Sequence, residues 1–313
     1  MPNALPILRA LADPTRLRIL SLVRRMELSI GELAQVLRQS QPRVSRHVKI
    51  LADAGLIDRH KEGAWVFLRP GRASDAQPAF AALDAWALDA SSGDMERLAA
   101  VRAERVAVAE EYFAAHADEW DSIRSLHIAD TEVESAIERA LADRPLGTLL
   151  DIGTGTGRMI ELLGPAANDS LGIDRSVDML RVARAKIEAA GLAQAQVRQA
   201  DMYALPIEDG GADTIILHQV LHFAHEPAQA IAEAARALAP GGRLLVVDFA
   251  PHDREELREQ YAHTRLGFDD ALVCGWLADA GLSARVADRL TGGPLTVTLW
   301  IGERAALPQA EAA

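Results

Sequence analysis

The stretch LLDIGTGTGR, which runs from Leu149 to Arg158, constrains the fold of this chain more than any other segment. A short apolar run is followed directly by glycines at positions 153, 155 and 157. Glycine lets the backbone turn tightly and lets a ligand approach bare peptide groups, because it has no side chain. Such a loop is typical of the carboxyl end of a parallel strand, so we predict an α/β domain that holds a ligand there.

Short apolar runs alternate with helical segments through the region that follows. Val177–Ala190 and Pro227–Leu238 are two of the expected helices. Alternation of strand and helix is typical of a parallel, doubly wound sheet. The predicted strands are Thr148–Ile152, Ser170–Asp174, Gln196–Ala200, Asp213–His218 and Arg243–Phe249.

The glycine spacing differs from that of a dinucleotide-binding loop. That fingerprint needs G-x-G-x-x-G, whereas the third glycine here comes one residue early and position 158 is arginine. Carboxylates lie at the ends of the next two strands. Asp174 is placed where it can accept hydrogen bonds from both ribose hydroxyls, and Asp201 where it can accept one from an adenine amino group. This combination predicts a nucleoside-type ligand and weakens the case for NAD; an ordinary set of α/β turns is the alternative.

The first third of the chain contains three predicted helices in close succession. Asp13 is placed as the N-cap of the first helix, and Pro14 occupies its first helical position. Ile30–Leu37 gives a second, short amphipathic helix. The third is expected from its N-cap, Ser40, to about Ala54, where a glycine ends it.

The third of these helices separates apolar from polar positions. Val44, Val48 and Leu51 form a stripe that we expect to be buried. The segment LIDRHKEGAWVFLRP then alternates around the turn Lys61-Glu62-Gly63, as a β-hairpin does. A helix-turn-helix followed by a hairpin is a winged helix; the alternative is a small helical bundle with a solvated basic face. The residues predicted to contact DNA bases or phosphates are Gln41, Arg43, Ser45, Arg46, His47, Lys49, Arg59 and Lys61.

Charge is distributed unevenly along the chain. The formal net charge is −12, which by itself argues against nucleic-acid binding. Residues 1–75 carry 13 Lys and Arg against 7 Asp and Glu, a net charge of +6, and the remaining residues carry −18. The split indicates that only the N-terminal part meets a polyanion such as double-stranded DNA; chance variation in surface charge is the alternative.

An alanine-rich region joins the two parts. Two helices are expected there, about Pro78–Ala90 and about Asp94–His116. Continuous helix forms a stiff link between domains, whereas a Gly/Ser linker is a loose tether. We therefore predict a winged helix-turn-helix domain over residues 1–75, a helical connector over 76–115 and an α/β domain over 116–313.

Two N-terminal segments, ADPTRLRIL and ELAQVLRQSQPRVSRHVKILADAGLI, resemble the arsenic-repressor (ArsR) family of dimeric winged-helix repressors over about residues 4–70. The resemblance implies a homodimer that binds operator DNA and pairs through the first connector helix. Metalloid-sensing members carry a cysteine pair in the helix before the recognition helix, where IGELAQVL has none. A thiophilic ion needs thiolates and Cys274 is the only cysteine, so we expect no metal site.

Five motifs mark the C-terminal region: LLDIGTGTGR, GIDRSVDML, QADMYALP, LHQVLHF and RALAPGGRLLVVDF. Over roughly residues 110–302 they are similar to the class I S-adenosylmethionine-dependent methyltransferases, especially the ubiquinone- and arsenite-methylating branch. The resemblance implies a Rossmann-like, seven-stranded sheet whose last strand, Leu295–Ile301, runs antiparallel. It also implies S-adenosylmethionine or S-adenosylhomocysteine as the ligand. The implied binding residues are Asp151, Gly153, Thr154, Gly155 and Gly157 for the methionine part, Asp174 for ribose, Asp201 and Met202 for adenine, His218 on the sulfur side, and Arg175 and Met179 in the same site.

Catalytic residues are harder to assign, because methyl transfer from a sulfonium needs alignment and requires a base only when the acceptor is protonated. The candidate bases are His218, His222 and Tyr112, with His225 and Arg124 in the same two segments. The spacing of the three histidines would also suit metal ligands on one helical face, although capping or pocket-wall residues are the simpler interpretation. Arsenite-methylating relatives hold the metalloid with several cysteines, so we do not expect that activity here.

Two functions from different classes follow. In the first, the chain is a transcriptional repressor whose methyltransferase-like domain binds S-adenosylhomocysteine or S-adenosylmethionine as an effector. ArsR fusions of this architecture resemble homocysteine-derivative-responsive regulators of the methionine cycle, which favours this function. In the second, the chain is an active methyltransferase of a small molecule, and the DNA-binding domain regulates its expression.

Three features are typical of a cytoplasmic protein. No apolar run approaches the ~20 residues needed to span a bilayer, so no membrane partner is expected. The N-terminus carries Arg9, Asp13 and Arg16 among its apolar residues, unlike a signal peptide. The single cysteine, Cys274, cannot form a disulfide within the chain.

Overall fold

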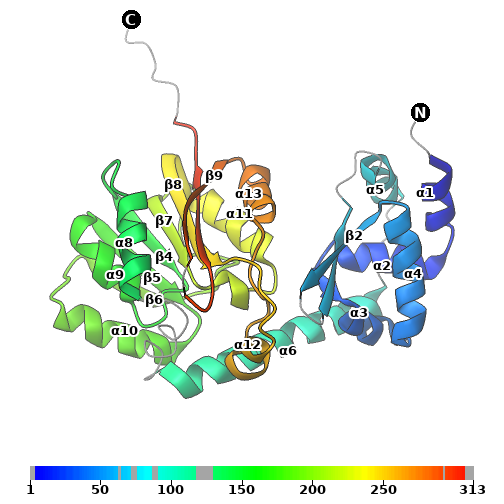
Figure 1. Cartoon of the computed structure of the whole chain (residues 1–313), viewed down its shortest axis with the longest axis horizontal. Helices are drawn as coiled ribbons and strands as arrows, with labels where there is room; N and C mark the ends of the chain where they lie inside the picture. The colour runs from blue at the N-terminus through cyan, green and yellow to red at the C-terminus, as the bar shows by residue number, and fades with distance from the viewer. Residues whose placement is uncertain are drawn as a thin grey trace, which may run out of the picture. The chain divides into compact units, whose positions relative to one another are not determined.

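The computed structural model describes residues 4–62, 65–71, 76–86, 91–117, 130–291 and 293–306. The chain divides into two compact units, residues 1–107 and residues 108–313 (Figure 1). The expected connector of residues 76–115 is therefore shared between them, because its first 32 positions belong to the N-terminal unit. The two units are described separately below.

Four helices begin the N-terminal unit: α1 (Ala4–Leu11), α2 (Pro14–Val23), α3 (Ile30–Leu37) and α4 (Gln41–Asp53). The predicted cap of α2 is confirmed, because the side chain of Asp13 accepts a hydrogen bond from the amide of Arg16 at 3.0 Å. Ser29 and Glu32 form a reciprocal capping box at the start of α3. Ser40 lies at the N-cap position of α4, but its side chain makes no capping hydrogen bond.

The hairpin predicted after α4 is confirmed. Strand β2 (Ile57–Glu62) pairs antiparallel with β3 (Trp65–Pro70), and the short β1 (Leu28–Ser29) pairs with the other edge of β3. The predicted turn residue Gly63 lies outside the described residues. Helices α2, α3 and α4 together with the three-stranded sheet therefore give the expected winged helix.

Two further helices complete the N-terminal unit. Helix α5 comprises Ala76–Ala85, and α6 comprises Ser92–His116 and continues into the second unit. Buried side chains of both helices belong to the same core as the stripe of α4. The core therefore includes the start of the predicted connector, with contributions from Val44, Val48, Leu51, Phe80, Leu83, Leu98 and Val101.

The C-terminal unit is built on a seven-stranded sheet with the order β6-β5-β4-β7-β8-β10-β9. The first five strands in this order run parallel, and β10 runs antiparallel to both β8 and β9. This confirms the doubly wound, seven-stranded fold with an antiparallel last strand. The strands are β4 (Thr148–Ile152), β5 (Asp169–Asp174), β6 (Ala195–Gln199), β7 (Ala212–His218), β8 (Leu238–Phe249), β9 (Ser283–Leu290) and β10 (Val297–Glu303).

Helices cover both faces of this sheet (Figure 1). One apolar core joins the sheet to α11 (Pro227–Ala237) and α13 (Asp270–Asp279). A second core joins the opposite face to α8 (Asp130–Ala140), α9 (Arg158–Leu163) and α10 (Val177–Ala189). A short helix, α12 (Glu256–Tyr261), follows β8. Among the described residues, no helix combines the length and the apolarity needed to cross a bilayer.

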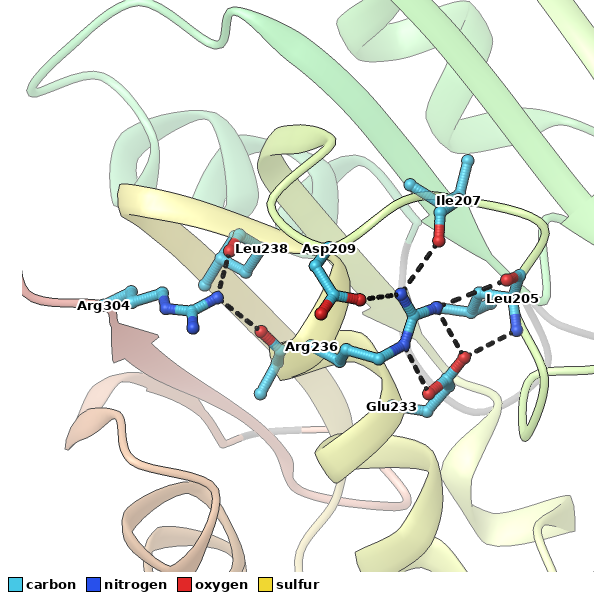
Figure 2. A network of polar contacts seen from close by, with 8 residues as sticks. Leu205, Ile207, Asp209, Glu233, Arg236, Leu238 and Arg304 are labelled. Carbon is cyan, nitrogen blue, oxygen red and sulfur yellow. Dashed lines mark hydrogen bonds and ion pairs between the residues drawn. The ribbon is translucent and has the colours of Figure 1, made fainter.

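A polar network fixes the loop that follows β6 and Asp201 (Figure 2). Arg236, at the end of α11, donates to the carbonyls of Leu205 and Ile207 at 3.3 and 2.9 Å. Its guanidinium also forms ion pairs with Glu233 and Asp209 at 2.8 and 2.6 Å. Hydrogen bonding from Arg236 holds the pKa of Glu233 below its usual value. This network anchors the return from β6 to β7, on which part of the predicted ligand site lies.

Candidate functional site

The recognition helix α4 presents its polar side chains as the sequence predicts. Val44, Val48 and Leu51 are buried, whereas Ser45 is half-buried. On the wing, β2 exposes two cations at alternate positions, so they share one face of the strand. The exposed members of the predicted DNA-binding set are Gln41, Arg43, Arg46, Lys49, Arg59 and Lys61.

His47 differs from the rest of this set. Its ring lies against the start of α2, where Nδ1 is 3.8 Å from a carboxylate oxygen of Asp13, and its side chain is 16% exposed. Burial raises the pKa of Asp13, but the hydrogen bond from the amide of Arg16 and the charges of Arg16 and His47 outweigh it, so the pKa is below its ordinary value. His47 therefore connects α4 to α2, and its contact with DNA remains a prediction.

The glycine-rich loop leads from β4 into α9 at the carboxyl edge of the sheet. The amides of Gly153 and Thr154 both donate to the carbonyl of Ile173, each at 2.8 Å. Gly153 and Gly157 have φ angles of +73° and +84°, which L side chains rarely adopt. A Cβ atom on Gly153 would lie 2.3 Å from Cγ2 of Val220, in the turn after β7. The loop therefore packs closely against that turn.

Arg158, which ends the loop motif, is engaged within the protein. Its guanidinium makes two hydrogen bonds of 2.6 Å to the carboxylate of Glu134 in α8. This pair connects the start of α9 to α8, so Arg158 contributes to the position of the loop.

Two carboxylates lie beside this loop, at the ends of the neighbouring strands. Asp174 accepts hydrogen bonds from the amides of Gly155 and Ser176 at 2.9 and 2.8 Å. Burial raises the pKa of Asp174 even though these bonds act in the opposite direction. Asp201 accepts from the amide of Tyr203 at 3.1 Å, and its other oxygen is 3.8 Å from Nη1 of Arg175. Because β4, β5 and β6 are adjacent, the predicted loop, ribose and adenine residues lie along one edge.

The other predicted ligand residues lie at different depths. Asp151 in β4 and Met179 in α10 are each 1% exposed, and Thr154 is buried as well. Met202 and His218, the last residue of β7, are half-buried. Their roles in ligand binding remain predictions.

The three histidines at and beyond the end of β7 do not share a helical face, so the prediction made from their spacing is wrong. His218 ends β7, His222 lies in a one-turn 3₁₀ helix (Leu221–Phe223), and His225 follows that turn. The ring of His225 is hydrogen-bonded to the hydroxyl of Tyr203 at 3.1 Å. In the part of the chain that the structure describes, no group of three or more His, Cys, Asp or Glu side chains could hold a metal ion. The side chain of Tyr112 and all of Arg124 lie outside the described residues.

His222 instead forms a buried pair with Asp248, near the end of β8. Its Nδ1 lies 2.8 Å from Oδ1 of Asp248, and its backbone amide donates to the second oxygen at 3.2 Å. The His263 ring stacks on His222 with a centroid distance of 4.1 Å. Burial lowers the pKa of nearby His252 to about 4, and the charge of His222 acts in the same direction. Asp248, His252 and His263 were not predicted from the sequence. The available signal was Asp248 itself, a carboxylate inside the apolar run LLVVDF.

Two family models match this chain, one in each unit. A model described as bacterial regulatory protein, arsR family, matches residues 13–59, and a model described as methyltransferase domain matches residues 150–246. A phosphatidylethanolamine N-methyltransferase of Cereibacter sphaeroides is 31% identical over 144 residues, which cover 45% of this chain and 68% of that protein. The chain belongs to the methyltransferase family and carries an arsR-family regulatory domain at its N-terminus.

Other relatives match one unit or the other. The arsenical resistance operon repressor of Escherichia coli is 43% identical over 22% of this chain and 62% of its own length. Demethylmenaquinone methyltransferase of Thermus thermophilus is 37% identical over 37% of this chain and 53% of its own length. The chain spans about half the length of most curated relatives that it matches.

A solved structure supports the fold of the second unit. The magnesium protoporphyrin IX methyltransferase of Synechocystis, determined with bound SAH, matches 64% of this chain and 99% of its own, with a TM-score of 0.52 and 20% identity. At this identity the match shows the fold alone.

Proposed function

We propose that the protein is a homodimeric transcriptional repressor whose methyltransferase unit binds S-adenosylhomocysteine or S-adenosylmethionine as an effector. The effector would change operator affinity and so control genes of the methionine and S-adenosylmethionine cycle. The observation that carries this proposal is helix α6, because it begins in the core of the DNA-binding unit and ends in the ligand-binding unit.

The DNA-binding part of the proposal is supported by the exposed face of α4 and by the wing. Arg43, Arg46 and Lys49 project from a helix whose opposite stripe is buried, as a helix that enters the major groove requires. Arg59 and Lys61 on β2 suit phosphate contacts beside it. The acidic C-terminal unit, by contrast, is repelled by phosphate.

The effector part is supported by the chemistry of the glycine-rich edge. Gly153, Gly155 and Gly157 all have positive φ angles, so the loop turns tightly at the carboxyl end of β4, where ligands of this kind of sheet bind. A carboxylate oxygen has two acceptor positions, and each oxygen of Asp174 uses one of them for a backbone amide. Ribose hydroxyls fit the positions that remain. We infer that these residues hold the adenosyl group, with Asp201 beside the base.

Helix α6 is anchored near its start by a buried ion cluster. Asp94 is fully buried and accepts two hydrogen bonds of 2.7 Å from Arg18 of α2. Arg97, one turn later, pairs with Asp94 and donates to the carbonyl of Val36 in α3 at 2.5 Å. Helices α2 and α3, which precede α4, are therefore both connected directly to α6.

Near its other end, α6 contacts the turn after β7. The ring of Phe113 packs edge-on against Phe223 with a centroid distance of 4.8 Å. Val220, at the start of the same turn, lies against Gly153 of the glycine-rich loop. A ligand that binds one protein geometry about 1–3 kcal/mol more tightly changes DNA affinity several-fold or more.

Exposed apolar side chains in the N-terminal unit support the homodimer. Leu5 and Leu8 lie one turn apart on α1 and are 54% and 58% exposed. Trp86, directly after α5, is 63% exposed. Leu5 and Leu8 form an exposed apolar strip on one helix, which is typical of a protein interface.

Operator binding in the presence of each ligand tests the proposal. Purified full-length protein is titrated against the DNA upstream of its own gene by fluorescence anisotropy, alone and with S-adenosylmethionine or S-adenosylhomocysteine. We expect at least one ligand to shift the apparent Kd several-fold, with calorimetry showing that it binds. Binding of both ligands without any change in DNA affinity would refute the regulatory function.

The second candidate function is methyl transfer to a small molecule, with the N-terminal unit as an autoregulator. The buried His222–Asp248 pair favours it, because effector binding alone needs no such pair. Transfer of a labelled methyl group to a metabolite, together with operator binding that ignores both ligands, would establish this function in place of the first.

A further inference from the structure

The His222–Asp248 pair has the geometry of an oriented base. An ionised carboxylate only accepts hydrogen bonds, so the 2.8 Å contact places a proton on Nδ1 of His222. In the neutral ring, Nε2 then carries the lone pair. Asp248 is itself fixed by the backbone amides of His222 and Phe249, at 3.2 and 2.8 Å. Both the tautomer and the ring orientation are therefore set by the fold.

Apolar rings surround this pair. The centroid of Phe223 lies 4.0 Å from that of His222, and the centroid of Phe249 lies 5.1 Å from it. His263 stacks on the imidazole from a separate segment after α12. His222 is 2% exposed and Asp248 is fully buried, so bulk water is largely excluded. Such surroundings strengthen electrostatic interactions.

The pair also lies next to the predicted adenosyl site. The sheet reverses its winding between β4 and β7, where ligands of doubly wound sheets bind. His222 follows the end of β7 by four residues, and Asp248 is the penultimate residue of the adjacent β8. Val220 of the same turn contacts Gly153 of the glycine-rich loop.

We propose that His222, oriented by Asp248, is the general base for methylation of a phenolic hydroxyl. The inference goes beyond repression and rests on the adenosyl-binding part of the proposed function. S-adenosylmethionine, when bound, supplies the methyl group: its S–CH₃ bond breaks as the O–CH₃ bond forms, and the electron pair stays on the sulfur of S-adenosylhomocysteine. His222 takes the hydroxyl proton on Nε2, and Asp248 stabilises the imidazolium that results.

A phenol fits this base better than an aliphatic alcohol. A phenolic hydroxyl, whose pKa is about 10 as in tyrosine, loses its proton far more readily than an alcohol does.

The test compares two acceptors that differ in their need for a base. Full-length protein is incubated with labelled S-adenosylmethionine and either phenol, 1-naphthol or 4-nitrophenol at mildly alkaline pH, where 4-nitrophenol is already ionised. We expect His222→Gln to lower transfer to phenol and 1-naphthol by roughly 10²–10⁴-fold, the usual contribution of a general base. Transfer to 4-nitrophenolate should fall far less, because this acceptor needs no base. If His222 were purely structural, the substitution would lower transfer to all three acceptors equally.

A matched control and a second readout complete the experiment. His60→Gln removes a half-buried histidine of β2, in the other unit and outside every predicted ligand or base position, and should retain transfer. Nitrogen NMR of the ligand-free protein should show a protonated Nδ1 and an unprotonated Nε2 on His222. A His222 protonated on both nitrogens at the assay pH overturns the proposal, as does equal loss with all three acceptors.

The outcomes separate this inference from the regulatory function. If wild-type protein binds S-adenosylmethionine by calorimetry and methylates none of the three phenols, the base assignment is wrong, while the operator assay still decides on repression. If neither adenosyl ligand binds, the proposed function fails and this inference fails with it. Methylation of phenols without any effect of ligand on DNA supports the base and refutes the effector.

Discussion

Two carboxylates, one in each unit, differ in the groups that surround them. Asp94 in the N-terminal unit is paired with Arg18 and Arg97, and the hydrogen bonds from Arg18 hold its pKa below the ordinary value. Asp174 in the C-terminal unit is hydrogen-bonded by backbone amides, and burial raises its pKa. The same side chain thus has opposite pKa directions in the two units.

The difference separates a structural carboxylate from one prepared for a ligand. Two guanidinium groups surround Asp94, so its role is to hold α2, α3 and α6 together. The backbone amides and the charge of Arg175 only partly offset the burial of Asp174, which keeps acceptor positions that ligand hydroxyls can satisfy. A buried carboxylate that lacks a strong cationic partner and lies at the carboxyl end of a parallel strand is therefore a better indicator of a binding site than burial alone.

The largest effect is expected when the predicted binding site around Asp174 is disrupted. Gly155 has a φ of +52° and donates its amide to Asp174, so Gly155→Val places a β-branched residue in a strained conformation beside the carboxylate. We expect adenosyl binding to weaken by at least ~100-fold, about 2.7 kcal/mol, in a calorimetric titration. DNA binding without ligand should persist.

Gly191→Ala is the control for that variant. Its φ is also positive, at +67°, but no atom lies within 4 Å of a Cβ placed there. Equal loss of affinity in both variants would show that backbone strain, and not the loop site, causes the effect.

The next largest effect concerns the structural carboxylate. Removing one partner of a buried ion pair costs about 3–5 kcal/mol, but Arg18 and Arg97 are 33% and 27% exposed and can be hydrated. We therefore expect Asp94→Ala to lower the free energy of unfolding by about 2–3 kcal/mol in urea titrations. Asp84→Ala removes the partner of Arg24 in a pair whose Asp84 side chain is 63% exposed, and should cost less than about 1 kcal/mol. Similar losses of unfolding free energy in the two variants would contradict the structural role assigned to the buried Asp94.

A third prediction asks whether the two units can be perturbed independently. Arg43→Ala on the exposed face of α4 should weaken operator binding by about 1–3 kcal/mol and leave adenosyl binding unchanged. Arg184→Ala, an exposed cation of α10, is the matched control and should leave DNA affinity unchanged. Anisotropy titrations at several salt concentrations measure both, and a weaker salt dependence for Arg43→Ala would indicate a lost phosphate contact.

The smallest effect is a difference in pH dependence. The pKa of Asp94 is lowered on folding, so its stabilisation is complete above the ordinary aspartate pKa of 3.8 and is lost as pH falls through the folded pKa. The pKa of Asp174 is raised, so its ionisation opposes folding once pH rises above the unfolded value, and acid relieves this cost. Asp94→Ala should flatten the acid decline in thermal stability, and Asp174→Asn should steepen it. The same change in slope for both variants would contradict the assigned pKa directions.

Local sequence patterns were sufficient to predict most of the fold. The predicted start of α2 was confirmed because Asp13 and Pro14 act within one helical turn. Strand β4 was predicted at Thr148–Ile152 with the observed bounds, since a short apolar run ends there at the glycines. The last strand lies two residues later than predicted, at Val297–Glu303, because its ends are set by pairing with β8 and β9.

Contacts between distant segments were not predictable in this way. The partners Arg18 and Asp94 are 76 positions apart, and His222 and Asp248 are 26 apart. Periodicity within a helix or strand carries no information about such pairs, because the sheet order and the helix packing bring them together. For the same reason, the spacing of His218, His222 and His225 suggested a helical face, although a strand end and a short turn separate them.

The close approach of Gly153 and Val220 limits how this family of sequences can diverge. A Cβ at position 153 would lie only 2.3 Å from a methyl group of Val220, and the φ of +73° strains any L side chain there even if position 220 became smaller. Position 153 should therefore remain glycine among homologues, which ties the inheritance of the glycine-rich loop to that of the histidine turn beside it.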